Sequence, residues 1–330
     1  MIDFNKLKDI IHSHRSFLLT THVNPDADAI GSEIALLRIL KKLNKEVFIY
    51  NHSKTPYNLL FLDPENAIKN FNPETDSGIF TNIDVLVALD FNRSDRIVSM
   101  QKPFNSSAKF KICIDHHHES EKFVDELFVD TKYSATSEIL FDFIKKTKLV
   151  ELDKSIADPI YAGIMTDTGS FRFERTTSNL HLIVAELIDA GVNPGEVYDK
   201  IYDQSKFSKI KLLGKALNSL TLTYDNQIGY MVLTQLDFNE VSGIESDTDG
   251  FVNHCLSVEN VKLGLLFIEL KNGFKVSFRS KGNIPANKLA GEFGGGGHTN
   301  AAGARFHSEN MNEFITIVLK KAQEYINNYQ

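Results

Sequence analysis

The chain has 330 residues, 42% of them hydrophobic, and a formal net charge of -7 at pH 7. This length exceeds what one hydrophobic core usually organises, so two domains are expected. The negative charge argues against a surface that grips long or duplex nucleic acid, because such binding needs clustered Lys and Arg. The chain also has no apolar run long enough to span a bilayer and no leader-like N-terminus, so we expect a cytoplasmic protein without a membrane partner.

The first half alternates short apolar, β-branched runs with helical apolar spacing. This pattern predicts an α/β domain with a mainly parallel sheet flanked by helices. We expect strands at 17–21, 47–50, 83–89 and 110–114, and helices at 27–43, 134–146, 154–165 and 179–190.

A breaker cluster at 191–195 marks the end of this domain. We therefore predict a first domain at 1–192, a connector at 193–222 with a helix over 197–220, and a smaller α/β domain at 223–330. In the smaller domain we expect strands at 230–234, 262–270 and 274–280 and a closing helix at 311–326. Cys113 and Cys255 belong to no paired motif and are expected to be buried.

Metal-competent side chains follow three of the predicted strands. His22 follows the first, Asp90 follows 83–89, and Asp115-His116-His117 follow 110–114. Ligands of an open parallel sheet bind outside the carboxyl ends of its strands, so these residues are expected to converge.

Three more acids join this set: Asp26 and Asp28 in the loop after His22, and Asp167 after an apolar helix. Taken singly, each suits a helix cap, turn or loop. Crowded carboxylates, however, repel one another unless protons or a cation neutralise them, so the set predicts a metal site. Pro25 stiffens the loop, and Gly31 permits close helix approach.

The segment His22-Val-Asn-Pro-Asp-Ala-Asp28 and the triplet Asp115-His116-His117 resemble the motifs of the DHH phosphoesterase superfamily. Asp90 and Asp167 match the two isolated aspartates of that family. The resemblance implies one ion held by His22, Asp26 and Asp90, and a second held by Asp28, Asp90, His116 and Asp167, with Asp90 bridging. It also implies that His117 contacts the reacting phosphate and that Asp115 orients its neighbours. His118 lies beyond the motif and is expected to be a surface or packing residue.

Carboxylates and two imidazoles without a thiolate favour Mn²⁺ or Mg²⁺ over zinc, and the imidazoles favour Mn²⁺; Co²⁺ is a further candidate. Two such ions stabilise the attacking and leaving oxygens of an in-line displacement.

The glycine-rich segment 292–303 suits either a flexible linker or a phosphate-binding loop with exposed backbone N–H groups. It resembles the substrate-binding DHHA1 domain, whose marker is a glycine run ending in His and followed by Ala-Ala-Gly. Arg279 is a candidate phosphate clamp beside this loop, and Arg96 is a second candidate from the first domain. The expected substrate-binding residues are Arg96, Arg279, Ser280, Gly295, Gly296, Gly297 and His298.

The domain content resembles the NrnA-like group of oligoribonucleases that also dephosphorylate 3′-phosphoadenosine 5′-phosphate. This resemblance implies hydrolysis of dinucleotides to about five nucleotides into 5′-mononucleotides, by analogy with that group. Two alternatives stay open: a phosphodiesterase for linear or cyclic di-AMP, and a nucleotide-binding regulator without catalysis. The sequence also leaves open a homo-oligomer, the cleavage polarity and any preference for RNA over DNA.

Overall fold

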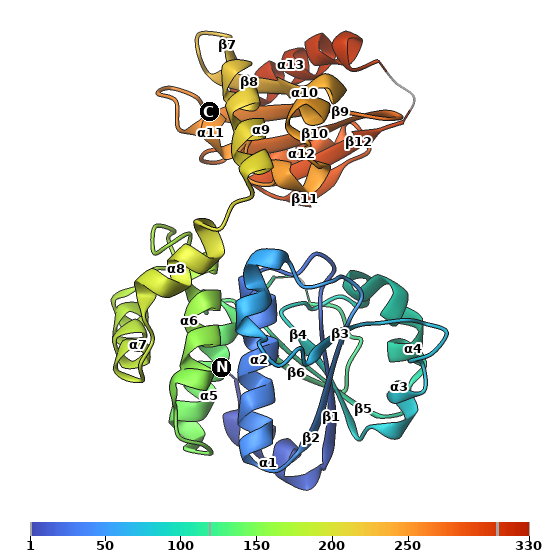
Figure 1. The fold of residues 1–330 in the computed structure, drawn as a ribbon, viewed down its shortest axis with the longest axis vertical. Helices are drawn as coiled ribbons and strands as arrows, with labels where there is room; N and C mark the ends of the chain where they lie inside the picture. Colours follow the sequence, from blue (N-terminus) through green and yellow to red (C-terminus); the bar gives the residue numbers. More distant parts are fainter. Residues whose placement is uncertain (1, 119, 308–309, 330) are drawn as a thin grey trace. The chain divides into compact units, whose positions relative to one another are not determined.

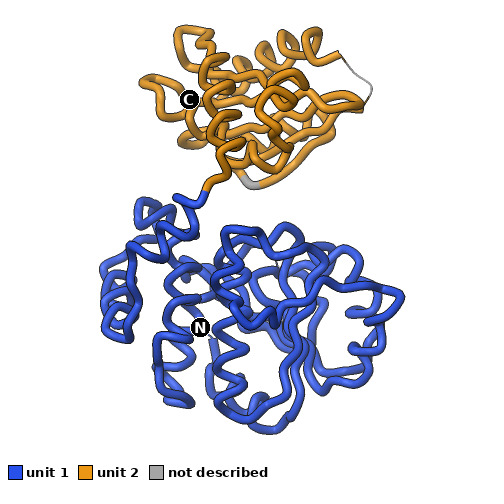
Figure 2. Tube along the Cα trace, viewed as in Figure 1, with its two compact units in different colours: residues 1–204 blue, residues 205–330 orange. Residues whose placement is uncertain are grey.

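The computed structural model describes residues 2–118, 120–307 and 310–329. The chain divides into two compact units, residues 1–204 (unit 1) and 205–330 (unit 2), as Figure 2 shows. The stretch expected to contain one connecting helix contains two, α8 (Pro194–Tyr202) in unit 1 and α9 (Phe207–Asn218) in unit 2. The chain leaves the helix at Asp203 and Ser205, whose short polar side chains compete with helical hydrogen bonds.

Unit 1 contains a parallel sheet, as predicted. Among the described residues its six strands lie in the order β3-β2-β1-β4-β5-β6, and each neighbouring pair is parallel. The strands are β1 (Ser16–Thr21), β2 (Glu46–Asn51), β3 (Ile68–Asn70), β4 (Val85–Leu89), β5 (Phe110–Asp115) and β6 (Glu126–Val129). The strand order reverses between β1 and β4, which makes that point the topological switch where such sheets bind ligands.

Helices cover both faces of this sheet (Figure 1). Phe17 and Leu19 of β1 point into the core on one face, whereas Leu18 points into the core on the other. The core on the first face includes residues of α1 (Phe4–Ser13), α2 (Ala27–Lys42), α5 (Thr136–Thr147), α6 (Lys154–Asp167), α7 (Ser178–Asp189) and the 3₁₀ helix η1 (Tyr57–Leu62), with α7 packed against α6. The second is covered by α3 (Ile79–Asn82), α4 (Gln101–Ser106) and the 3₁₀ helix η2 (Ser94–Met100).

Unit 2 contains a mostly antiparallel sheet in the order β11-β12-β10-β9-β8-β7, in which β8 and β9 are parallel. Its strands are β7 (Thr221–Thr223), β8 (Ile228–Leu233), β9 (Leu263–Leu270), β10 (Gly273–Ser280), β11 (Gly296–His298) and β12 (Ala301–Phe306). One face packs against α12 (Ala286–Gly291) and α13 (Met311–Asn328). The other packs against α9, α10 (Gln235–Val241) and α11 (Asn253–Leu256), with the 3₁₀ helix η3 (Glu245–Thr248) between the last two in sequence. Within the described part of the chain, no helix combines the length and apolar character needed to cross a membrane.

The contact between α2 and α6 depends on two glycines. A Cβ atom at Gly31 of α2 would lie 2.3 Å from the carbonyl oxygen of Pro159 in α6. A Cβ atom at Gly163 of α6 would lie 2.5 Å from Oδ1 of Asp28 in α2. Because α2 carries Asp28 and α6 ends at Asp167, this contact fixes how two of the predicted ligands approach each other.

We expect Gly31→Ala to destabilise unit 1 by about 1–3 kcal/mol, because the added methyl group meets backbone atoms that cannot move independently. Gly195→Ala in α8 is the matched control, since its nearest neighbour would be Asn193 Oδ1 at 3.5 Å. Thermal unfolding of the full chain measures both variants. Equal midpoints for the two would mean that the α2 and α6 backbones have room to separate.

Candidate metal centre

The predicted ligands converge at the carboxyl edge of the unit 1 sheet. His22 directly follows β1, Asp90 directly follows β4, and Asp115 is the last residue of β5. Because β1, β4 and β5 are neighbours in the sheet, their ends present these side chains side by side at the switch point.

His22, Asp26 and Asp90 form the first group, with ligand atoms all within 4.8 Å of one another. His22 Nε2 lies 3.4 Å from Asp90 Oδ2. His22 Nδ1 lies 2.9 Å from the Val23 carbonyl oxygen, which can only accept, so Nδ1 carries the proton and Nε2 has a lone pair for an ion. Asp26 caps α2 through Oδ1, which accepts hydrogen bonds from the backbone N–H groups of Asp28 and Ala29.

Asp28, His116 and Asp167 form the second group. His116 Nε2 lies 3.1 Å from Asp167 Oδ2 and 3.9 Å from Asp28 Oδ2. It also lies 3.6 Å from Asp90 Oδ1. The two oxygens of Asp90 therefore face different groups, Oδ2 toward His22 and Oδ1 toward His116.

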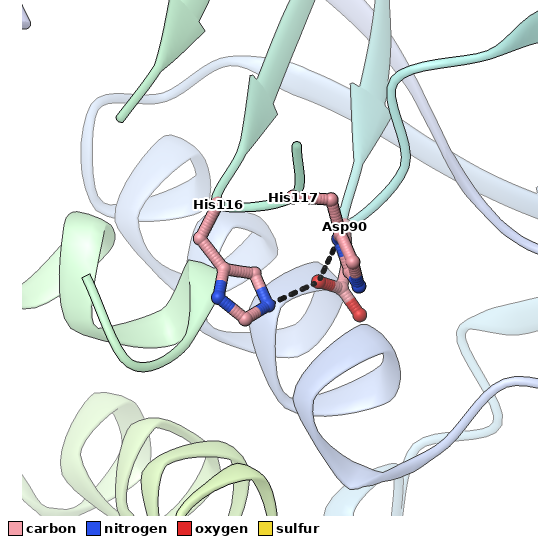
Figure 3. Close-up of side chains that lie close together, drawn as sticks. All are labelled: Asp90, His116 and His117. Atoms are coloured by element: carbon pink, nitrogen blue, oxygen red, sulfur yellow. Dashed lines mark ion pairs between the residues drawn. The ribbon is translucent and has the colours of Figure 1, made fainter. Parts of the chain in front are cut away.

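His117 and Asp115 lie beside these groups. Figure 3 shows His116 and His117, which follow β5, next to Asp90, and the dashed lines mark the two ion pairs to Asp90. Asp115 Oδ1 lies 2.7 Å from His117 Nδ1, and Asp115 Oδ2 accepts a hydrogen bond from the His117 backbone N–H. Asp115 is buried, whereas the His117 side chain is 39% exposed. Asp115 thus orients an imidazole that a substrate can reach.

The protonation of the second group depends on crowding of like charge. Burial and the charges of Asp28, Asp26, Asp167 and Asp115 raise the pKa of Asp90 well above its usual value. Burial and the charge of Asp28 also raise the pKa of Asp167 to about 7, against the opposing effect of His116. Burial alone would lower the pKa of His116, but contact with Asp167 and the charges of Asp28 and Asp115 raise it to about 9.

These residues fit divalent cations. His116 Nε2 is buried and has no hydrogen bond of suitable geometry among the described residues. Asp90 is buried among four further carboxylates that oppose its ionisation. Cations between these groups would satisfy the imidazole nitrogen and remove the repulsion, and the mix of carboxylate and imidazole suits Mn²⁺, Mg²⁺ or Co²⁺.

The expected substrate residues lie in both units. Arg96 is an exposed residue of η2, and its carbonyl oxygen accepts a hydrogen bond from Val23, next to His22. Arg279 is a half-buried residue of β10 whose guanidinium donates to the Phe278 carbonyl oxygen, and burial lowers its pKa. The Ser280 hydroxyl is occupied within unit 2, where it donates to Ile284 and accepts from Asn300.

The glycine-rich segment forms part of the unit 2 sheet. Gly296 and Gly297 belong to the edge strand β11, which pairs with β12, and Gly295 precedes it. A Cβ atom at Gly295 would lie 2.3 Å from the Gly303 carbonyl oxygen, and one at Gly297 would lie 2.4 Å from that of Ala301. Gly295 and Gly297 are therefore required for close pairing, whereas Gly296 faces open space. The side chain of His298 lies outside the described part of the structure.

Several contacts with the predicted ligands were not expected from the sequence. The start of α5 contacts Asp28 and Asp90 through Thr136 and Ser137. Arg175 donates to the Tyr133 carbonyl oxygen, and its guanidinium lies 3.4 Å from His116 Nδ1 and 3.3 Å from Nε2 of the exposed His118. The run Ser134-Ala-Thr-Ser137 opens the helix predicted at 134–146, and because polar side chains of this kind are typical of helix starts, nothing local indicated a carboxylate partner.

Comparison with known proteins agrees with this geometry. The sequence matches the model of the DHH family, N-terminal domain, over residues 16–164 and that of the DHHA1 domain over residues 231–324. It is 34% identical over 306 residues to the bifunctional oligoribonuclease and PAP phosphatase NrnA of Thermus thermophilus, an alignment that covers 93% of this chain and 89% of the relative. The chain belongs to the DHH family. The family assignment and the order of the two domains were both predicted from the sequence motifs.

Two further relatives support the DHH family assignment. The protein of the same name from Bacillus subtilis is 29% identical over 90% of this chain and 91% of its own length. The crystal structure of an exopolyphosphatase-related protein from Bacteroides fragilis matches with a TM-score of 0.93 and 30% identity, covering 98% of this chain and 96% of that one.

Ion binding to the second group is expected to release protons. Only unprotonated groups coordinate an ion, yet without ions the pKa is about 9 for His116 and about 7 for Asp167. Lowering the pH therefore favours the protonated, ion-free state, and the apparent affinity for Mn²⁺ should rise between about pH 6 and about pH 9, by up to about tenfold per pH unit for each proton released. Titration calorimetry in buffers of different ionisation enthalpy counts the protons. A binding enthalpy independent of the buffer would contradict this expectation.

Asp90→Ala is expected to be more damaging than His22→Ala, because Asp90 has one oxygen toward each group whereas His22 serves only the first. Loss of a bridging carboxylate should cost several kcal/mol of transition-state stabilisation, about a hundredfold or more in turnover. Turnover and Mn²⁺ stoichiometry are compared in the two variants. If Asp90→Ala retained more of either than His22→Ala, the bridging role of Asp90 would be wrong.

Proposed function

We propose that this chain is a two-metal phosphoesterase that hydrolyses short oligonucleotides to 5′-mononucleotides and 3′-phosphoadenosine 5′-phosphate to AMP. The observation that supports this most strongly is the position of Asp90 at the switch point, where Oδ2 faces His22 of the first group and Oδ1 faces His116 of the second. Relatives named bifunctional oligoribonuclease and PAP phosphatase, which align over at least 90% of the chain, support the choice of substrates.

His22, Asp26 and Asp90 would hold one divalent ion, and Asp28, Asp90, His116 and Asp167 the other, with Mn²⁺ preferred. When bound, two such ions supply positive charge at the attacking and leaving oxygens and favour deprotonation of the attacking water. His117 is the protein group that contacts the reacting phosphate. Asp115 Oδ1 accepts a hydrogen bond from His117 Nδ1, which fixes the orientation of the imidazole.

The two proposed reactions break the same kind of bond. In an oligonucleotide, water adds to phosphorus and the P–O3′ bond breaks, which leaves a 5′-phosphate on one product and a 3′-hydroxyl on the other. In the bisphosphate, water adds to the 3′-phosphate and the P–O3′ bond breaks, which releases inorganic phosphate and AMP. The leaving group is a ribose 3′-oxygen in both cases, so one arrangement of catalytic residues serves both substrates.

Unit 2 is proposed to bind a part of the substrate that does not react. Arg279 would contact a phosphate, because a guanidinium matches a phosphate with two parallel hydrogen bonds. The outer edge of β11, with Gly295, Gly296, Gly297 and His298, would add backbone N–H donors. Ser280 supports the turn at Asn300 next to this edge, and Arg96 is the corresponding candidate from unit 1.

Substrate length tests this proposal. Each nucleotide beyond the first few adds conformational freedom to be restricted on binding, and the net charge of -7 provides little attraction for a long strand. We expect turnover to fall from two to five nucleotides, to be poor on long or duplex RNA, and to vanish with a chelator until Mn²⁺ is restored. The measurement is a time course on labelled oligomers, 3′-phosphoadenosine 5′-phosphate and linear and cyclic di-AMP. Faster degradation of a long strand than of a dinucleotide would refute it.

Arg279→Ala should raise KM by about 10- to 100-fold, the range expected when a hydrogen bond to a charged group is lost, and leave Mn²⁺ binding unchanged. Arg305→Ala is the matched control, because Arg305 lies on the neighbouring strand and is already paired with Glu245. Steady-state kinetics on a dinucleotide gives both values. An unchanged KM in the Arg279 variant would leave Arg279 with a structural role only.

A further inference from the structure

The start of α5 contacts ligands that come from elements far away in sequence. Thr136 lies 108 residues from Asp28 and 46 residues from Asp90, and it forms a hydrogen bond with each of them. Thr136, Asp28 and Asp90 are all buried. This contact is therefore shielded from water. A hydrogen bond in the protein interior is stronger than one in water, so it holds its partners more firmly.

Both oxygens of Asp28 accept hydrogen bonds from the first turn of α5. The Thr136 backbone N–H donates to Oδ2 at 2.6 Å, and the Ser137 backbone N–H donates to Oδ1 at 2.9 Å. These N–H groups have no partner within their own helix, and the helix N-terminus has partial positive charge. The helix start thus fixes the plane of the carboxylate, while Oδ2, the oxygen nearer His116, retains a lone pair for an ion.

The Thr136 hydroxyl has a different partner. It donates to Asp90 Oδ1 at 2.9 Å, and this oxygen faces His116, whereas Oδ2 faces His22. A single residue thus orients the carboxylates of two proposed ligands to the second ion.

The first group is built differently. His22 is oriented by the carbonyl oxygen of Val23, its neighbour in the chain, and Asp26 is oriented by the first turn of its own helix. The second group depends on α5, and the same segment supplies the Tyr133 carbonyl oxygen, 3.4 Å from His116 Nδ1. Apart from Asp90, which the two ion sites share, the ligands of each site therefore have separate supports.

We propose that Thr136 is a positioning residue that sets the affinity of the second ion site, formed by Asp28, Asp90, His116 and Asp167, more strongly than that of the first, with which it shares only Asp90. This proposal rests on the proposed function, because it takes these four residues as ligands. Its consequence is that a change at Thr136 alters the affinities of the two sites to different extents.

Titration calorimetry with Mn²⁺ on the ion-free full-length protein tests this selectivity. Thr136→Val removes the hydroxyl but retains the shape and the backbone N–H, and it should weaken one of two binding steps by about 10- to 100-fold, the usual effect of losing a hydrogen bond to a ligand. Thr136→Ser restores the hydroxyl and should restore the affinity. Thr147→Val is the matched control, because among the described residues the Thr147 hydroxyl bonds only the Phe143 carbonyl oxygen of the same helix.

A second comparison identifies the affected site. In a His22→Ala background the remaining strong site is the one next to α5, so adding Thr136→Val should weaken that remaining step by the same factor. Thermal unfolding without Mn²⁺ checks that each variant folds, and Thr136→Ala, which cannot clash, replaces Thr136→Val if the latter does not fold. Equal weakening of both steps, no weakening, or failure of Thr136→Ser to restore affinity would overturn the proposal. If the unaltered protein bound no Mn²⁺, the proposed function itself would fail.

Discussion

Repulsion among buried carboxylates is the constraint on which the rest of unit 1 depends. Asp26, Asp28, Asp115 and Asp167 all raise the pKa of Asp90, and no chain would bring these acids together without something to offset the cost. The protein offsets part of it with neutral donors: the helix start at Thr136 and Ser137 and the N-terminal turn of α2. The repulsion that remains between the carboxylates favours the binding of cations to the ion-free protein.

Much of this centre could be predicted from the sequence, because its residues stand at fixed points of a regular pattern. The carboxyl ends of parallel strands lie at the same edge of a sheet. His22, Asp90 and the triplet Asp115-His116-His117 were therefore expected to lie close together, even without knowledge of the strand order. The long strands and helices could be predicted because each repeats its apolar pattern several times, a helix over several turns and a strand over several alternating residues. The resemblance to the DHH motifs additionally predicted which of the two ions each ligand would hold.

The rest could not be predicted, because it depends on contacts that leave no local pattern. Short edge strands such as β3 and β11 contain too few residues for a periodicity, and glycines of β11 suggested a loop rather than a strand. Thr136 has the residue type of an ordinary helix start, and only the packing of α5 against α2 and β5 gives its hydroxyl a carboxylate partner. The break between α8 and α9 was also missed, because the polar and apolar spacing continues through Asp203 and Ser205.

The glycine contact between α2 and α6 also bears on which ions the centre accepts. Asp28 stands on one helix and Asp167 at the end of the other, so the gap between their carboxylates depends on how closely two helical backbones approach. A Cβ atom at Gly31 would meet the Pro159 backbone, and one at Gly163 would meet Ser137 Oγ and Asp28 Oδ1, so the close approach depends on the absence of side chains at both positions. A methyl group at Gly31 would act as a spacer between the two helices. We expect it to widen the gap between the two carboxylates and so to weaken binding of a small ion such as Mg²⁺, which requires near-ideal geometry.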